Sequence, residues 1–84
     1  MEEVIKDHIS RELVRDPGLL PIQNDTLLLE TGILDSLSLL SLLLFLEDEF
    51  GVQVDDFELI PENFSTVDAI CTYIRSQQRL QKAE

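Results

Sequence analysis

The fold of this chain is decided by residues 35–51, which read DSLSLLSLLLFLEDEFG. Asp35 suits the position just before a helix, because its carboxylate can accept hydrogen bonds from the free N–H groups of the first turn. Gly51 suits the position just after a helix, where a left-handed backbone costs glycine little. The apolar-rich run between these two residues therefore predicts a helix from Ser36 to Phe50.

The apolar side chains of this helix divide between two faces. A helix turns by about 100° per residue, so apolar residues that recur every three or four positions form one stripe, which is expected to face the core. Its members are Leu39, Leu42, Leu43, Leu46 and Phe50. Leu37 and Leu44 point to nearly the opposite side, with Leu40 on the flank between. These three leucines are either covered by the preceding loop or form an exposed patch that partner proteins grip, and the sequence leaves both alternatives open. In the second case the patch would be rimmed by Ser38, Ser41 and Asp48.

The chain before this helix predicts another helix and then a long loop. Ile5, Ile9 and Leu13 recur at every fourth position, which is typical of a helix over residues 2–15, and a Pro-Gly pair ends it. The loop over residues 16–35 is longer than compact domains usually allow and is rich in leucine and isoleucine. We therefore expect it to lie across the core.

Two more helices are expected after the central one. A short helix or turn is predicted over residues 56–60, stopped by Pro61, and a last helix is predicted over residues 65–81. The apolar face of the last helix consists of Val67, Ile70, Cys71 and Ile74. The predicted fold class is all-α, a four-helix bundle of three main helices and one short helix, in a single domain over residues 1–84.

Charge separates an acidic middle of the chain from two ends that carry every basic residue. The net charge is −11 at pH 7, and the basic residues are Lys6, Arg11, Arg15, Arg75, Arg79 and Lys82. A field of one sign repels nucleic acid and anionic membranes and steers basic proteins. The N-terminus has no signal-peptide pattern, and the longest apolar run is too short to span a bilayer. We expect a cytoplasmic monomer without nucleic-acid or membrane partners.

The sequence offers no set of residues for catalysis or metal binding. One cysteine and one histidine cannot form a zinc site, and Ser36 lacks the glycine-flanked elbow of serine hydrolases. Cys71 is expected to be a buried thiol, and His8 an exposed surface side chain. We therefore predict that the chain is not an enzyme and holds no metal.

Residues 35–37 read Asp-Ser-Leu at the start of the central helix, and this arrangement resembles the attachment motif of the acyl and peptidyl carrier proteins. The similarity extends through LLETGILDSL at 28–37, FLEDEFGV at 45–52, FSTV at 64–67 and Ile70. The resemblance implies a discrete carrier in which Ser36 bears covalent 4′-phosphopantetheine. It also implies that a phosphopantetheinyl transferase attaches this group and contacts Asp35 and Leu37.

The resemblance further implies that the thiol of the arm carries an acyl or aminoacyl group as a thioester between loading and processing enzymes. Such carriers serve fatty acid, polyketide or nonribosomal peptide biosynthesis. Family members often have acidic residues early in the second helix, whereas this chain has Ser38 and Ser41 there. We therefore expect apolar docking in a specialised, secondary-metabolite pathway. The expected docking residues are Leu37, Leu40, Ser41, Leu44, Glu47 and Asp48.

One alternative belongs to a different class of protein. An acidic helical adaptor could bind a basic partner non-covalently through Leu37, Leu40 and Leu44, with no modification of Ser36. Both hypotheses use the same helix, and they differ only in whether the serine accepts a covalent group.

Overall fold

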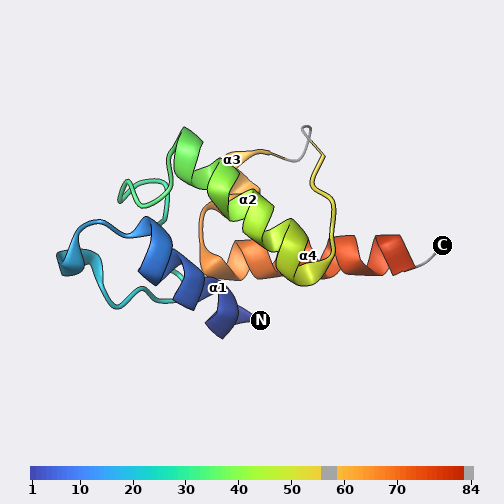
Figure 1. Ribbon diagram of the computed structural model, residues 1–84, viewed down its shortest axis with the longest axis horizontal. Coiled ribbons are helices and arrows are strands. Elements are labelled where there is room, and N and C mark those ends of the chain that lie inside the picture. The colour runs from blue at the N-terminus through green and yellow to red at the C-terminus, as the bar shows by residue number, and fades with distance from the viewer. Residues whose placement is uncertain (56–58, 83–84) are drawn as a thin grey trace.

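The computed structural model describes residues 1–55 and 59–82, and this part of the chain is helical without any strand. The elements are α1 (Glu2–His8), η1 (Ile9–Leu13), η2 (Pro17–Leu19), α2 (Ser36–Phe50), α3 (Pro61–Phe64) and α4 (Val67–Lys82). In Figure 1, α4 is horizontal and α2 runs diagonally to it. The long loop lies at the left, past the N-terminal end of α4. The predicted all-α fold with four helices is confirmed.

The central helix α2 begins and ends where the sequence predicts. The N–H of Ser38 donates to Oδ1 of Asp35 at 2.9 Å, which caps the first turn. Gly51 follows the helix with φ of 65°, and its N–H donates to the carbonyl of Glu47 at 3.0 Å. The stripe expected to face the core does so, with Leu39 and Phe50 partly buried and with full burial of Leu42, Leu43 and Leu46.

The core is closed by apolar faces from the first and last helices. α1 and α4 pack against each other. Ile5 and Ile9 on one side are fully buried, as are the four residues predicted for the last helix, Val67, Ile70, Cys71 and Ile74. Burial raises the pKa of the Cys71 thiol above its ordinary value, so this cysteine stays protonated and unreactive at neutral pH.

The long loop is part of the core, as predicted. Its buried side chains are Ile22, Leu28, Ile33 and Leu34. Main-chain hydrogen bonds tie it to the other end of the sequence: the N–H of Leu28 donates to the carbonyl of Ser65 at 2.8 Å, and the N–H of Asp68 donates to the carbonyl of Asn24 at 3.1 Å. The loop is therefore tied to the start of α4.

The first helix ends earlier than the predicted residue 15. After α1 the chain widens into the π-helical turn η1, in which the N–H of Val14 donates to the carbonyl of Ile9 at 3.0 Å. Val14 itself is extended, with φ of −79° and ψ of 118°. The apolar spacing that predicts a helix continues only to Leu13. Residues 15–18, which would form the next helical turn, are exposed.

Pro61, which the sequence predicts as a stop, is the first residue of the short third helix. Residues 56–58 of the predicted segment lie outside the described residues, and residues 59 and 60 are not helical. α3 instead begins at Pro61. Proline lacks an N–H and has a fixed φ, and both properties suit the first position of a helix as well as they suit a stop.

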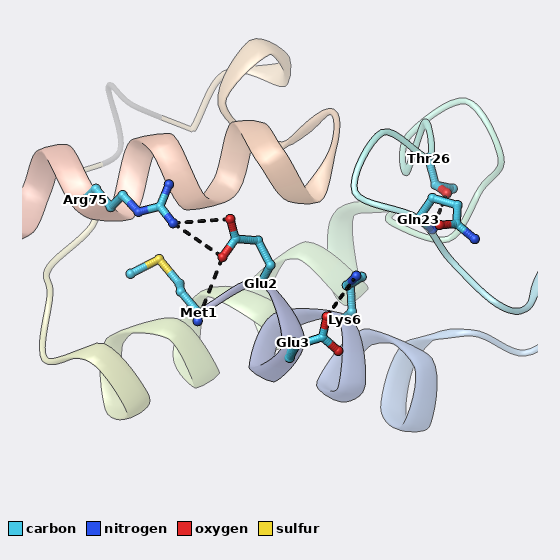
Figure 2. A network of polar contacts seen from close by, with 7 residues as sticks. All are labelled: Met1, Glu2, Glu3, Lys6, Gln23, Thr26 and Arg75. Carbon is cyan, nitrogen blue, oxygen red and sulfur yellow. Dashed lines mark hydrogen bonds and ion pairs between the residues drawn. The ribbon is translucent and has the colours of Figure 1, made fainter.

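An ion pair joins the start of α1 to α4 (Figure 2). Nη2 of Arg75 lies 3.3 Å from Oε1 and 3.2 Å from Oε2 of Glu2. The pKa of Glu2 is held below its ordinary value, first by a hydrogen bond from its own backbone and then by Arg75. This contact fixes the N-terminal end of α1 beside the middle of α4.

His8 is not the exposed surface residue that the sequence predicts. It is half-buried, and its ring stacks on Phe45 of α2 with 3.8 Å between centroids and 6° between planes. Nε2 of His8 is buried and has no hydrogen-bond partner among the described residues. The histidine therefore serves as a flat, largely apolar contact between α1 and α2.

Candidate attachment site at the start of the central helix

Ser36 is the first residue of α2 and is exposed to solvent. The first main-chain N–H of this helix to reach a carbonyl four residues back is that of Leu39, which donates to Asp35 at 2.8 Å. The N–H groups ahead of it lie at the positive end of the helix dipole, which is a favourable place for a phosphate. The serine hydroxyl thus stands outside the bundle at a position suited to an anionic substituent.

Asp35 orders the first turn beside this serine. Its pKa is lowered, first by the hydrogen bond from the Ser38 backbone N–H, and also by the Ser38 hydroxyl, the Leu37 N–H and the charge of Arg15. Ser38 is buried beneath the turn and bonded to Asp35, so the expectation that it rims an exposed patch is wrong. The carboxylate stays ionised at neutral pH and fixes the backbone on both sides of Ser36.

Three leucines on α2 form an exposed apolar strip that begins next to Ser36. Leu37 is 76% exposed, Leu40 is 55% exposed and Leu44 is 69% exposed. We call these three residues the leucine patch. The long loop therefore does not cover them, and their role in partner binding stays a prediction. Ser41 and Asp48 are exposed on the same side of the helix.

Glu47 differs from the other predicted docking residues in its surroundings. It is half-buried, and its Oε2 accepts the N–H of Val54 at 3.1 Å. Nearby, Nε2 of the buried Gln77 donates to the carbonyl of Gln53 at 3.0 Å. Glu47 and Gln77 therefore hold the segment after α2.

A cavity of about 230 Å³ lies beside Asp35 and was not foreseen from the sequence. Arg15 lines it together with Asp16, Gly32, Asp35 and Ser38. The one available signal was that Arg15 is the last basic residue before the acidic middle of the chain. The folded chain brings this cation to the same cavity as Asp35, 20 positions further along the sequence, which spacing along one helix could not predict.

The described residues hold no group of three His, Cys, Asp or Glu side chains that could bind a metal ion. Nor does any helix within residues 1–55 and 59–82 have the length and apolar character needed to cross a membrane. The residues at the start of α2 present an exposed serine at a helix end that favours anions, with the exposed leucine patch beside it.

An exposed serine at a helix start in a small helical domain is compatible with attachment of a prosthetic group. Residues 3–74 match the family model described as phosphopantetheine attachment site, and the chain belongs to this family. A comparison with individually curated proteins gives no match. Domains of this family carry 4′-phosphopantetheine covalently on a serine, are not enzymes themselves, and interact with transferases and biosynthetic enzymes.

The residues at the start of α2 fit the phosphate of that group. The exposed hydroxyl of Ser36 would supply the attachment oxygen, and the N–H groups of the first turn and the dipole would favour the phosphodiester charge. No cysteine is needed from the protein, because the terminal thiol of the arm supplies the thioester. The buried Cys71 is consistent with this division of roles.

Proposed function

We propose that Ser36 is the serine that bears the arm. The serines of the chain are Ser10, Ser36, Ser38, Ser41, Ser65 and Ser76, and the structure describes all of them. Only Ser36 and Ser41 are exposed, and Ser41 lies within α2, away from the helix end. The observation that carries the proposal is an exposed serine at the first position of α2, directly after a capping aspartate.

Measurement of intact mass tests this assignment. The protein is incubated with coenzyme A, Mg²⁺ and a broad-specificity phosphopantetheinyl transferase. We expect the wild type to gain the mass of one phosphopantetheine group and Ser36→Ala to gain nothing. Ser41→Ala is the matched control, since it removes the other exposed serine, and it should be modified like the wild type. An unmodified wild type would instead support the non-covalent adaptor.

We also propose that the leucine patch is the surface on which partner enzymes dock. Large exposed apolar side chains that lie together on one helix face mark binding surfaces in soluble proteins. Ser41 and Asp48 provide a polar margin on the same side, and Glu47 contributes charge at its end. Asp35 and Leu37, which flank Ser36, are the residues proposed to contact the transferase.

The apolar character of this surface supports a particular kind of pathway. The turn that follows Ser36 bears no acidic side chain, because the first acids of α2 are Glu47, Asp48 and Glu49. Partners that recognise carriers through salt bridges close to the serine would find no charge there to pair with. We therefore propose a specialised pathway whose loading enzyme attaches an acyl or aminoacyl group and grips apolar side chains. Mass spectrometry of the protein purified from its native host, with the thioester intact, identifies the cargo.

We further propose that the chain acts in the cytoplasm as a monomeric, single-domain carrier. Its strong negative charge supports this proposal, because like-charged copies repel each other and anionic membranes. Light scattering on the purified protein tests the monomer, and fractionation of host cells tests the location. A stable dimer or recovery with the membrane fraction would contradict these two points.

A further inference from the structure

Arg15 lines the same cavity as Asp35, the residue that precedes Ser36. The helical chain ends at Leu13, and the extended Val14 leads directly to Arg15. The side chains of Arg15, Asp35 and Ser38 then line the same cavity of about 230 Å³. Arg15 is the only basic residue among those that line it. The fold has therefore brought one cation to the N-terminal end of α2 in a chain of net charge −11.

The acidic neighbours of Arg15 make their hydrogen bonds elsewhere. Oδ1 of Asp16 accepts the N–H of Gly18 at 2.9 Å, and Oδ1 of Asp35 accepts the N–H of Ser38 at 2.9 Å. No ion pair joins Arg15 to any residue in the described part of the chain. Its charge still acts on Asp35, since it contributes to the lowered pKa of that carboxylate. The guanidinium donors are thus free to bind a second anion nearby.

A phosphodiester on Ser36 would be that second anion. It would add a fixed negative charge beside the ionised Asp35, which is unfavourable unless a cation lies close. A guanidinium is suited to this role, because its planar set of N–H donors matches two phosphate oxygens at once and stays charged at any physiological pH. We propose that Arg15 binds the phosphate of the arm and so fixes the direction in which the arm leaves Ser36. This inference rests on the proposed function of Ser36.

Side-chain NMR gives a direct reading of this contact. The Nε–Hε resonances of the arginines are recorded in the unmodified protein and after attachment of phosphopantetheine. We expect the Arg15 resonance to shift on attachment and those of Arg75 and Arg79 to stay in place. Arg75 is held by Glu2 and Arg79 is exposed on α4, so both report on general effects of modification. An unmoved Arg15 resonance in fully modified protein would overturn the inference.

Thermal unfolding gives a second, independent reading. The quantity of interest is the change in Tm when Ser36 is modified, compared between variants. The Tm after modification minus the Tm before it should be about 2–4 °C lower in Arg15→Gln than in the wild type, because the phosphate then lacks its cation. Arg15→Lys, which keeps a point charge, should lie between them. Arg79→Gln removes the same charge from an exposed site on α4 and should behave like the wild type.

The two proposals fail in different ways. Intact mass is measured first, and a wild type without mass gain rejects Ser36 as the attachment site. If mass is gained but Arg15→Gln and Arg79→Gln respond alike to modification, Ser36 stands and the role of Arg15 is rejected. The difference between these variants should also shrink at about 1 M salt, where the screening length is about 3 Å. A difference of unchanged size at that salt concentration would mean that Arg15 acts through packing and would contradict the inference.

Discussion

The imidazole of His8 lies flat on the ring of Phe45, with 3.8 Å between the ring centroids. This contact joins the last residue of α1 to the middle of α2, while the ion pair of Glu2 with Arg75 joins the first residue of α1 to α4. The first helix is therefore attached to each of the two long helices by a different kind of interaction. One is a stack of two rings, and the other is an ion pair.

Replacing Phe45 with leucine should lower stability by about 1 kcal/mol, because the stack is lost while most of the apolar contact is kept. For a domain of this size such a loss lowers Tm by about 4–8 °C. Thermal unfolding of Phe45→Leu, His8→Leu and the double variant gives the coupling between the two rings. Additive effects of the two single changes would mean that the stack contributes nothing specific.

The leucine patch can be tested without disturbing the fold. Leu44→Glu should leave helicity and Tm nearly unchanged, because the side chain is already in solvent, and should lower transfer from the loading enzyme by about tenfold or more. Leu80→Glu is the matched control, since Leu80 is 64% exposed but lies near the far end of α4. Equal loss of transfer in both variants would count against a localised docking surface.

Two adjacent leucines of the loop should respond in opposite ways to the same change. Leu28 is fully buried, so Leu28→Ala should cost about 2–5 kcal/mol of folding free energy through lost contact and a cavity. Leu27 is exposed, and Leu27→Ala should change stability by no more than about 0.5 kcal/mol. Urea unfolding measures both. Similar small effects would show that the loop lies over the bundle without belonging to its core.

The cap at the start of α2 should make stability depend on pH. Because the pKa of Asp35 is lower in the folded chain, its contribution is present above the unfolded value of about 3.9 and is lost as pH falls through the lower folded value. Asp35→Asn should therefore be less stable than the wild type at pH 7, with the difference shrinking in strong acid. Melting curves of both proteins, recorded from pH 7 down to strong acid, measure this difference in stability. A difference that stays constant in acid would mean that ionisation of Asp35 does not matter.

The features that the sequence predicted correctly depend on local chemistry. The ends of α2 follow from Asp35 and Gly51, whose side-chain and backbone preferences act within one turn. The core faces of α1 and α4 follow from spacing along one helix. Ser36 lies within this well-predicted region, so its exposure at a helix start could be anticipated from neighbouring residues.

The features that were missed depend on contacts between distant segments or on ambiguous residues. Nothing near His8 in the sequence indicates that Phe45 will cover its ring, and nothing near Arg15 indicates that it will face Asp35. Pro61 is ambiguous in a different way, because proline both ends helices and begins them. Such cases are decided by the folded arrangement and not by propensity.

The size of the leucine patch limits how a carrier built this way can meet its partners. The patch covers seven helical steps from Leu37 to Leu44, which is about 10 Å of helix. A strip this short has room for one enzyme at a time, and it lies directly beside the proposed attachment point of the arm. If partners dock on this patch as proposed, each must leave before the next can bind, and the order of binding is set by competition among them for one surface.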